Sequence, residues 1–191
     1  SLYANIDGFN YSEKTIPINL RSELDRWILS ELNSLIKSVD YNYDSYEPTK
    51  VSRAIQDFTI DKLSNWYVRL SRRRFWKGEY STQKTAAYQT LYECLETIAI
   101  IASPLAPFFM ETLFQDLNNV SKRHDFKSVH LSDFPKISHS IINTQLERKM
   151  SLAQNITSLA LSLRKKERLR VRQPLQKIMI PLLNKKMEED L

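Results

Sequence analysis

The stretch LDRWILSELNSLIK, residues 24–37, decides the fold class of this chain. Apolar side chains recur there at steps of three and four, which places one apolar stripe along an α-helix with about 3.6 residues per turn. The stripe runs through Leu24, Trp27, Ile28, Leu32, Leu35 and Ile36. Helix signals begin at Ser22, and residues 42–45 read as a polar connection. The stretch therefore predicts a helix that begins near Ser22 and buries one face.

Similar stripes predict four more helices further along the chain. Pro48 suits the first turn of the second helix, and Ser103-Pro104 reads as a cap and a first-turn proline that open the fourth. The expected ranges are residues 48–78, 82–102, 104–117 and 144–163. In the fifth helix, the residues expected to face inward are Leu146, Met150, Ala153, Ile156, Ala160 and Leu163. Residues 119–142 read as a polar loop with a short strand at residues 129–131.

Glycine is scarce, and this supports a helical fold. Only Gly8 and Gly78 occur among 191 residues, whereas a turn-dense β fold uses glycine at many turns. The same scarcity excludes a glycine-rich phosphate loop of the Walker or Rossmann kind. The sequence therefore predicts an all-α protein, an antiparallel helical bundle, with one short strand near the C-terminus at residues 177–180.

Composition bounds the class of protein and of partner. A hydrophobic content of 42% with 26% charged residues is ordinary for a globular protein, and the net charge of +6 favours a polyanionic partner. The longest apolar stretch, residues 98–110, is too short for a membrane span and holds two prolines. We expect a monomeric, cytoplasmic protein with no membrane partner. Because the first residue is not methionine and the last element reads as unfinished, we expect a piece of a longer chain.

Residues that could carry chemistry are few. His124, His130 and His139 do not have the spacing of metal ligands. The single cysteine, Cys94, excludes an internal disulfide and fits a helix as a small apolar side chain. We therefore expect no catalytic residue, metal site or cofactor in this chain.

The stretch LSNWYVRLSRRRFWKG, residues 63–78, is the first of two basic clusters. Its basic residues are Arg69, Arg72, Arg73, Arg74 and Lys77. Phe75 and Trp76 come after the core-facing positions of the helix, whereas Trp66 lies on the inward stripe and is expected in the core. An exposed tryptophan beside arginines could stack on a base while the guanidinium groups pair with phosphates, as in proteins that bind single-stranded nucleic acid.

The second cluster is LRKKERLRVRQPL, residues 163–175. It contains Arg164, Lys165, Lys166, Arg168, Arg170 and Arg172. The competing hypothesis is a helical protein-interaction or scaffold module in which both clusters are solvated helix ends, because cations also favour helix C-termini. An exposed Trp76, with both clusters on one face, would favour nucleic-acid binding.

Six blocks of the chain together resemble isoleucyl-tRNA synthetases. They are LYANIDGF (residues 2–9), LDRWILSELN (24–33), DKLSNWYVRLSRRRFW (61–76), IASPLAPFFMETLFQDL (101–117), SVHLSDFP (128–135) and RLRVRQPL (168–175). Their order and spacing also match, over nearly the whole chain. The second block and the Trp-Tyr helix recur in the valine and leucine enzymes, so the same domain of one of those enzymes is the alternative.

The resemblance implies the helical anticodon-binding domain that follows the catalytic domain of such an enzyme. Residues 1–20 would be an irregular lead-in from the catalytic domain, residues 21–175 the helical domain, and residues 176–191 the start of a C-terminal region. The whole enzyme would activate isoleucine with ATP and Mg²⁺ and attach it to its tRNA. The partner of this chain would be the anticodon stem-loop of the isoleucine tRNA.

The resemblance also implies roles for the two clusters. In the sister methionine enzyme, a tryptophan just after the corresponding long helix meets the anticodon, so Trp76 is expected to stack on a base. Arg72, Arg73 and Arg74 would pair with phosphates or base edges, and Arg69 and Lys77 complete this set. The second cluster would hold the RNA backbone through Arg164, Lys165, Lys166, Arg168, Arg170 and Arg172.

Overall fold

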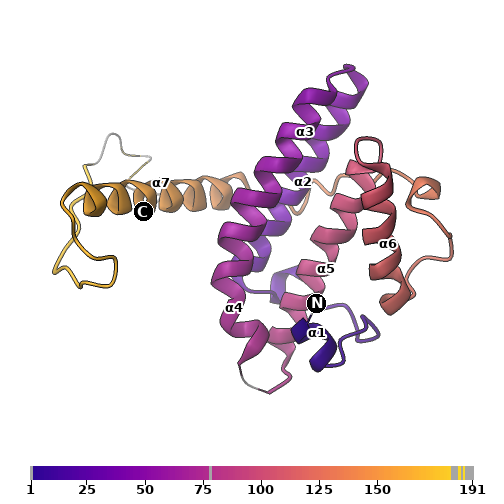
Figure 1. The fold of residues 1–191 in the computed structure, drawn as a ribbon, viewed down its shortest axis with the longest axis horizontal. Helices are drawn as coiled ribbons and strands as arrows, with labels where there is room; N and C mark the ends of the chain where they lie inside the picture. The colour runs from indigo at the N-terminus through magenta and orange to yellow at the C-terminus, as the bar shows by residue number, and fades with distance from the viewer. Residues whose placement is uncertain (1, 78, 182–184, 186, 188–191) are drawn as a thin grey trace. The chain divides into compact units, whose positions relative to one another are not determined.

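The computed structural model describes residues 2–77, 79–181, 185 and 187, and its regular elements are helices (Figure 1). No strand occurs in these ranges, so the prediction of an all-α protein is confirmed. The chain divides into two compact units, Ser1–Ile142 and Asn143–Leu191. None of the helices in the described ranges is long and apolar enough to cross a lipid bilayer.

The first unit is built on an antiparallel pair of helices. Helix α2 (Glu23–Asp44) begins where the sequence predicts, because the Ser22 hydroxyl accepts a hydrogen bond from the backbone N–H of Asp25. The Asp25 carboxylate in turn accepts from the Ser22 N–H, which completes a capping box. Helix α3 (Pro48–Asp57) carries Pro48 in its first turn, as predicted, and packs along α2.

The long second helix continues beyond α3 without a break. It passes through the π-helix η2 (Phe58–Val68) into helix α4 (Arg69–Trp76). A π-helix takes more residues per turn than an α-helix, so it changes which side chains point inward. Tyr67, near the end of η2, is fully buried against α2 and α5 (Thr82–Ala102).

Helix α5 begins and ends where predicted, but α6 (Pro107–Ser121) does not. The prediction that Ser103-Pro104 opens the fourth helix is wrong. Ser103 instead closes α5, with both its backbone N–H and its hydroxyl donating to the carbonyl of Ile100. Pro107 is the proline in the first turn of α6, which runs past the expected end at residue 117.

The strand predicted at residues 129–131 is a short 3₁₀-helix, η3 (Val129–Leu131). Glu111 on α6 accepts hydrogen bonds from the Val129 N–H at 2.8 Å and from the Ser128 hydroxyl at 3.0 Å. Val129 is buried with Ala99 and Phe114. The segment is therefore held by the buried Val129 side chain and by its hydrogen bonds to the Glu111 carboxylate. No strand lies beside it in the described ranges.

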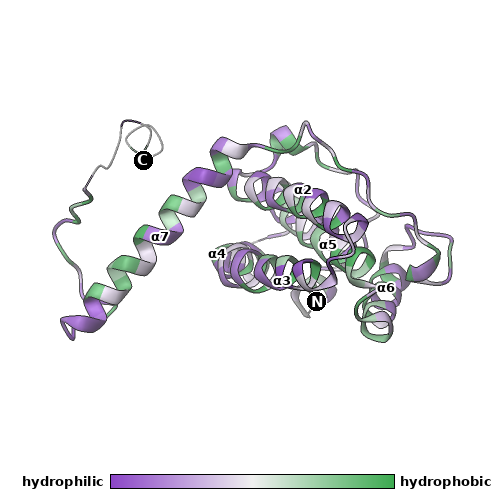
Figure 2. Ribbon diagram, turned by 90° about the horizontal axis from the view of Figure 1, so that it is seen from above, coloured by the Kyte–Doolittle hydropathy of each residue, from purple (hydrophilic) through white to green (hydrophobic). Residues whose placement is uncertain are grey.

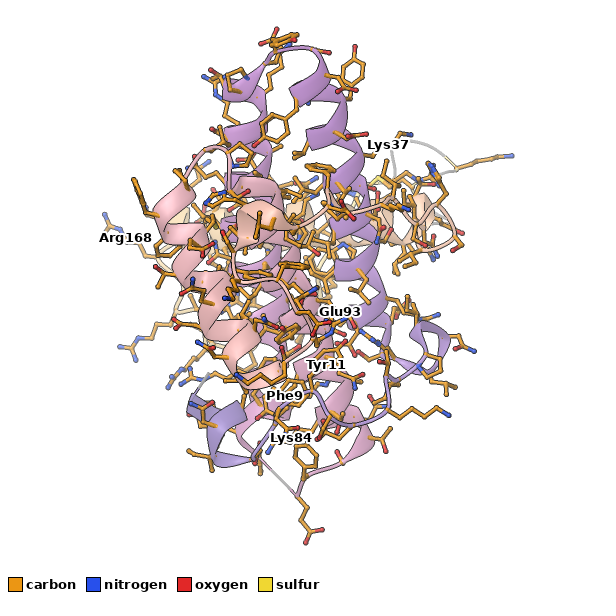
Figure 3. All side chains as sticks on the ribbon, turned by 90° about the vertical axis from the view of Figure 1, so that its right-hand side faces the viewer. Phe9, Tyr11, Lys37, Lys84, Glu93 and Arg168 are labelled. Carbon is orange, nitrogen blue, oxygen red and sulfur yellow. The ribbon has the colours of Figure 1, made fainter. Side chains whose placement is uncertain are left out.

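The segment before α2 lies along α5. It contains the short helix α1 (Leu2–Ile6) and the 3₁₀-turn η1 (Ile18–Leu20), and polar groups of α5 hold the residues between them. The buried Lys84 pairs with Asp7 at 2.6 Å, and Glu93 accepts from the Tyr11 hydroxyl at 2.8 Å (Figure 3). Arg21, also buried, donates two hydrogen bonds to Glu93. These contacts fix α1 against the end of the bundle that carries α4.

The second unit contains helix α7 (Thr144–Lys166). Asn143 caps it by accepting from the Leu146 N–H at 3.0 Å. The prediction that its apolar stripe faces inward is wrong for Ala153 and Leu163, which are exposed, whereas Leu146 is buried and Met150, Ile156 and Ala160 are half-buried. The strand predicted at residues 177–180 is also absent, because this segment has no regular structure and no partner strand among the described residues.

A buried ion pair joins α2, η2, α4 and α5. Arg74 donates to both carboxylate oxygens of Asp25, at 2.8 and 2.7 Å, and the Tyr67 hydroxyl donates to the same carboxylate at 2.7 Å. Burial alone would raise the pKa of Asp25, but the hydrogen bonds from Arg74, Tyr67 and Ser22 outweigh it and hold that pKa below its usual value. Asp25 is therefore a buried carboxylate that stays charged in the folded protein.

Replacement of Asp25 tests this ion pair. We expect Asp25→Asn to lower the free energy of unfolding at pH 7 by about 3–5 kcal/mol, because it leaves the Arg74 charge without its partner. The pKa of Asp25 is lowered on folding, so the difference from wild type should be complete well above pH 3.8 and shrink as the pH falls below it. Urea denaturation of both proteins at several pH values measures this. Asp40→Asn, an exposed change on α2, is the control, and equal losses for the two variants would contradict the role of Asp25.

Candidate nucleic-acid interface

The outer face of α4 carries an exposed tryptophan among arginines. Arg72 and Arg73 precede Trp76 by four and three residues, so all three side chains lie on one face of the helix, and Arg69 continues that face one turn earlier. Trp76 is 52% exposed, and the arginines are exposed as well. No carboxylate in the described ranges forms an ion pair with any of these three arginines. The face therefore offers a flat aromatic surface beside cations that are available to a partner.

Phe75, one position earlier than Trp76, faces the bundle. It is only 7% exposed and stacks on Tyr88 of α5 with the ring centres 5.4 Å apart. The prediction that Phe75 lies beyond the core-facing positions is therefore wrong, because α4 packs against α5 up to its last turn. One residue turns an α-helix by about 100°, so the same packing directs Trp76 outward. Trp66, expected in the core, is half-buried.

Arg74 differs from the other basic residues of the cluster. Besides its two bonds to Asp25, its guanidinium group donates to the Gln83 carbonyl at 2.8 Å and to the Ser22 hydroxyl at 3.2 Å. Its hydrogen-bonding capacity is thus committed to the bundle. The sequence holds one signal for this difference: Arg74 comes seven residues after Tyr67, which places it on the core-facing side of the helix.

A polar cleft lies on one side of this face, at the junction of α4 and α5. Its volume is about 320 Å³. Arg73 and Lys77 are the exposed cations in its lining, whereas Arg74 and Lys84 already have carboxylate partners. The cleft is lined by Arg73, Arg74, Lys77, Glu79, Ser81, Gln83 and Lys84. A phosphate group could approach Arg73 and Lys77 there without breaking a buried ion pair.

The second basic cluster belongs to the second unit, where it follows the end of α7. Hydrophilic residues gather at this end of the helix (Figure 2). Arg168 has a φ of 56° and closes the helix in a left-handed cap, in which the Leu169 N–H donates to the Arg164 carbonyl at 2.8 Å. The basic side chains that are exposed here are Lys165, Lys166, Arg168, Arg170 and Arg172.

Arg164 has a local structural contact that its neighbours lack. Its guanidinium group donates to the carbonyls of Arg170 and Gln173, at 2.8 and 2.9 Å, and so fixes the turn after α7. The two basic clusters lie in different units, each described by itself. That both clusters share one face therefore stays a prediction.

His124 and Cys94, whose side chain types often serve in catalysis or metal binding, pack within the fold. His124 lies 2.8 Å from the Glu96 carboxylate and packs on Phe114 and Phe126. Cys94 is fully buried, and burial raises the pKa of its thiol well above the usual value. Across the part of the chain that the structure describes, no three His, Cys, Asp or Glu side chains are grouped so that they could hold a metal ion.

Comparison with known proteins agrees with the family suggested by the sequence. The family model described as the anticodon-binding domain of tRNA ligase matches residues 25–179. An isoleucine–tRNA ligase from Cytophaga hutchinsonii is 59% identical over 183 residues, which cover 96% of this chain and 16% of that protein. Relatives of the same name from Bacteroides thetaiotaomicron and Dehalococcoides mccartyi are 52% and 47% identical over 98% and 94% of this chain. The chain spans 16% and 18% of the length of these two proteins.

The different exposures of Trp76 and Phe75 predict different losses of stability when each is replaced by alanine. We expect Trp76→Ala to change the free energy of unfolding by less than about 1 kcal/mol, because half of the side chain is already in water. Phe75→Ala is the matched comparison and should cost about 3–5 kcal/mol, because it opens a cavity against Tyr88. Chemical denaturation of the two variants measures both values. A loss for Trp76→Ala as large as that for Phe75→Ala would place Trp76 in the core.

Proposed function

Because this chain belongs to the family of anticodon-binding domains of tRNA ligases, we propose that it holds the anticodon stem-loop of the isoleucine tRNA within an isoleucine–tRNA ligase. The observation that carries the proposal is the face of α4, where the exposed Trp76 lies between Arg72 and Arg73. The isoleucine assignment rests on the names of the relatives and on the sequence blocks. The scaffold hypothesis explains neither the names of the relatives nor the sequence blocks. The relatives compared above are isoleucine enzymes, not valine or leucine enzymes.

An anticodon loop suits this surface chemically. Its three bases can leave the stack and present their faces and edges, which bases inside an A-form stem cannot do. A base stacked on the ring of Trp76 would contribute about 1–3 kcal/mol of binding free energy. Cations that contact phosphates set the position of the RNA, and contacts to bases set its identity. Trp76 would therefore hold one base out of the stack, and the surrounding arginines would position the RNA or contact base edges.

The basic residues then divide by role. Arg69, Arg72, Arg73 and Lys77 contact RNA phosphates or base edges around Trp76. Arg74 acts as a positioning residue, because its contacts with Asp25 and Gln83 hold the last turn of α4 in place. In the second unit, the exposed residues Lys165, Lys166, Arg168, Arg170 and Arg172 hold the RNA backbone, and Arg164 orders the turn that presents them.

The chemistry of the ligase is assigned to the remainder of the longer protein. Isoleucine activation with ATP and Mg²⁺ followed by transfer to the tRNA is proposed for the whole enzyme, acting as a monomer in the cytoplasm. No step through ATP or Mg²⁺ is assigned to this chain. Its role is recognition, which allows the other end of the tRNA to reach the catalytic domain.

Titration with RNA tests the role of Trp76. We expect Trp76→Ala to weaken binding of the isoleucine anticodon stem-loop by about 1–3 kcal/mol at constant salt. The loss should be smaller for a stem-loop with a scrambled anticodon, because that loop does not place its base on the ring. Fluorescence anisotropy with both RNAs measures the two losses. Equal losses on both RNAs would remove Trp76 from the recognition site.

The role of the second cluster is tested by salt. Replacing Arg168, Arg170 and Arg172 with alanine should weaken binding about equally for cognate and scrambled stem-loops, because phosphate contacts carry no sequence information. The slope of log K against log salt should become shallower by somewhat less than one for each lost phosphate contact. Lys37→Ala, an exposed cation on α2 outside both clusters, is the control. An unchanged slope in the triple variant would show that these arginines do not touch RNA.

A further inference from the structure

Tyr88 of α5 contacts both the segment before α2 and the last turn of α4. We propose that Tyr88 is a positioning residue, which holds the Trp76 surface in place and couples it to that segment. This role rests on the proposed function and deepens it. Tyr88 is only 4% exposed, so it acts through the residues that it contacts and not on the RNA itself.

Two buried aromatic rings pack on the ring of Tyr88. The ring of Phe75 stacks on it, with the ring centres 5.4 Å apart and the planes 26° apart. Phe9, from the segment before α2, lies with its ring centre 5.3 Å from that of Tyr88. Buried side chains are packed as closely as molecules in an organic crystal. Neither Phe9 nor Phe75 can therefore move far without displacing Tyr88.

The Tyr88 hydroxyl reaches the same two parts of the chain. It donates to the Asp7 carboxylate at 2.6 Å, and it lies 3.1 Å from the Phe75 carbonyl oxygen. A phenol carries one proton, so these two acceptors share a single donor. Phe75 is the last residue but one of α4, where a carbonyl has no partner within the helix. Tyr88 supplies the hydrogen bond that the helix cannot.

Asp7 competes strongly for that proton. Hydrogen bonds from Lys84 and Tyr88 hold the pKa of Asp7 below its usual value, so it is a carboxylate at neutral pH. Burial and the contact with Asp7 raise the pKa of Tyr88, so its hydroxyl keeps the proton. A hydrogen bond to a charged acceptor is the stronger of the two. The share of the proton that reaches Phe75 therefore depends on where Asp7 is held.

The backbone of Phe75 sets the position of Trp76. The Phe75 carbonyl belongs to the planar peptide unit that joins these two residues, so a hydrogen bond to it fixes the plane from which Trp76 departs. Arg74 holds the preceding residue through its bonds to Asp25 and to the Gln83 carbonyl. Tyr88 fixes the peptide that follows. A ring that is ordered before binding lowers the cost of ordering on binding.

The contacts of Asp7 extend the coupling beyond α4. Asp7 directly follows α1, and it pairs with Lys84 at 2.6 Å. Residues 1–20 are expected to lead in from the catalytic domain. A displacement of this segment changes the competition for the Tyr88 proton and so the hold on Phe75. Coupling between two sites is reciprocal, so RNA bound at Trp76 acts on the same hydrogen bonds.

Removal of the hydroxyl alone tests the positioning role. Tyr88→Phe keeps the ring and removes both hydrogen bonds. Tyr92→Phe, one turn later on α5, is the matched control, because that buried hydroxyl bonds with Ser121 of α6 instead. We expect Tyr88→Phe to weaken binding of the isoleucine anticodon stem-loop about three- to tenfold at an unchanged salt slope, with a smaller loss for the scrambled loop. Tyr92→Phe should change neither affinity. Equal losses on both loops, or equal losses in the two variants, would overturn the positioning role.

The coupling to Asp7 is measured on Trp76 itself, in the absence of RNA. The chain is labelled with fluorotryptophan, and Trp76→Phe assigns the fluorine resonance of Trp76 among the three tryptophans. Asp7→Asn should shift this resonance in a chain that retains Tyr88 and leave it unchanged in the Tyr88→Phe background, because the hydroxyl is the link. Equal shifts in both backgrounds would overturn the coupling.

The two measurements separate this role from the proposed function. If Trp76→Ala leaves RNA binding unchanged while Asp7→Asn shifts the resonance only where Tyr88 is present, the coupling stands and the proposed function fails. If Trp76→Ala weakens binding and Tyr88→Phe changes neither binding nor the resonance, the proposed function stands and Tyr88 has no positioning role. Thermal melts of all variants exclude loss of folding as the cause.

Discussion

The ion pair between Asp25 and Arg74 is the interaction on which the rest of the first unit depends. It joins the first turn of α2 to the last turn of α4, and Arg74 also reaches the start of α5 through the Gln83 carbonyl. A buried carboxylate of this kind contributes to a fold only when all its lone pairs are satisfied, and here Arg74, Tyr67 and Ser22 satisfy them. Burial raises the pKa of Tyr67 well above its usual value, so its hydroxyl keeps the proton it donates.

The same interaction determines what the end of α4 presents to a partner. With Arg74 held inward and Phe75 packed on Tyr88, the helix cannot rotate, so Trp76 and Arg73 must face outward. Three arginines and a tryptophan on one short face are unfavourable for the isolated protein, because like charges three and four residues apart repel. Because the arginines of this face are held close together in spite of their mutual repulsion, the face is suited to bind a polyanion, whose charges offset that repulsion.

The sequence predicted the helices well because each is marked by its own residues, such as Ser22 before α2 and Pro48 in α3. It failed where the outcome depends on a distant partner. The spacing of Arg74 from Tyr67 indicates which way Arg74 faces, but it does not identify the carboxylate partner, which is Asp25, 49 residues earlier. Ser103 could have opened one helix or closed another, and its bond to Ile100 decides between them. Periodicity alone also could not show that Ala153 and Leu163 of the α7 stripe stay exposed.

The positions of the cations in this chain indicate its partner better than its net charge does. The cations that lie inside the bundle each have a carboxylate: Arg21 has Glu93, Lys84 has Asp7 and Arg74 has Asp25. These pairs follow from the cost of burying an unpaired charge, and they say nothing about a ligand. Apart from these pairs, exposed cations that form no ion pair among the described residues cluster on the face of α4 in the first unit and, separately, after α7 in the second. A net charge of +6 would suit many proteins, but exposed cations that form no ion pair among the described residues, around an exposed aromatic ring, suit a folded RNA loop.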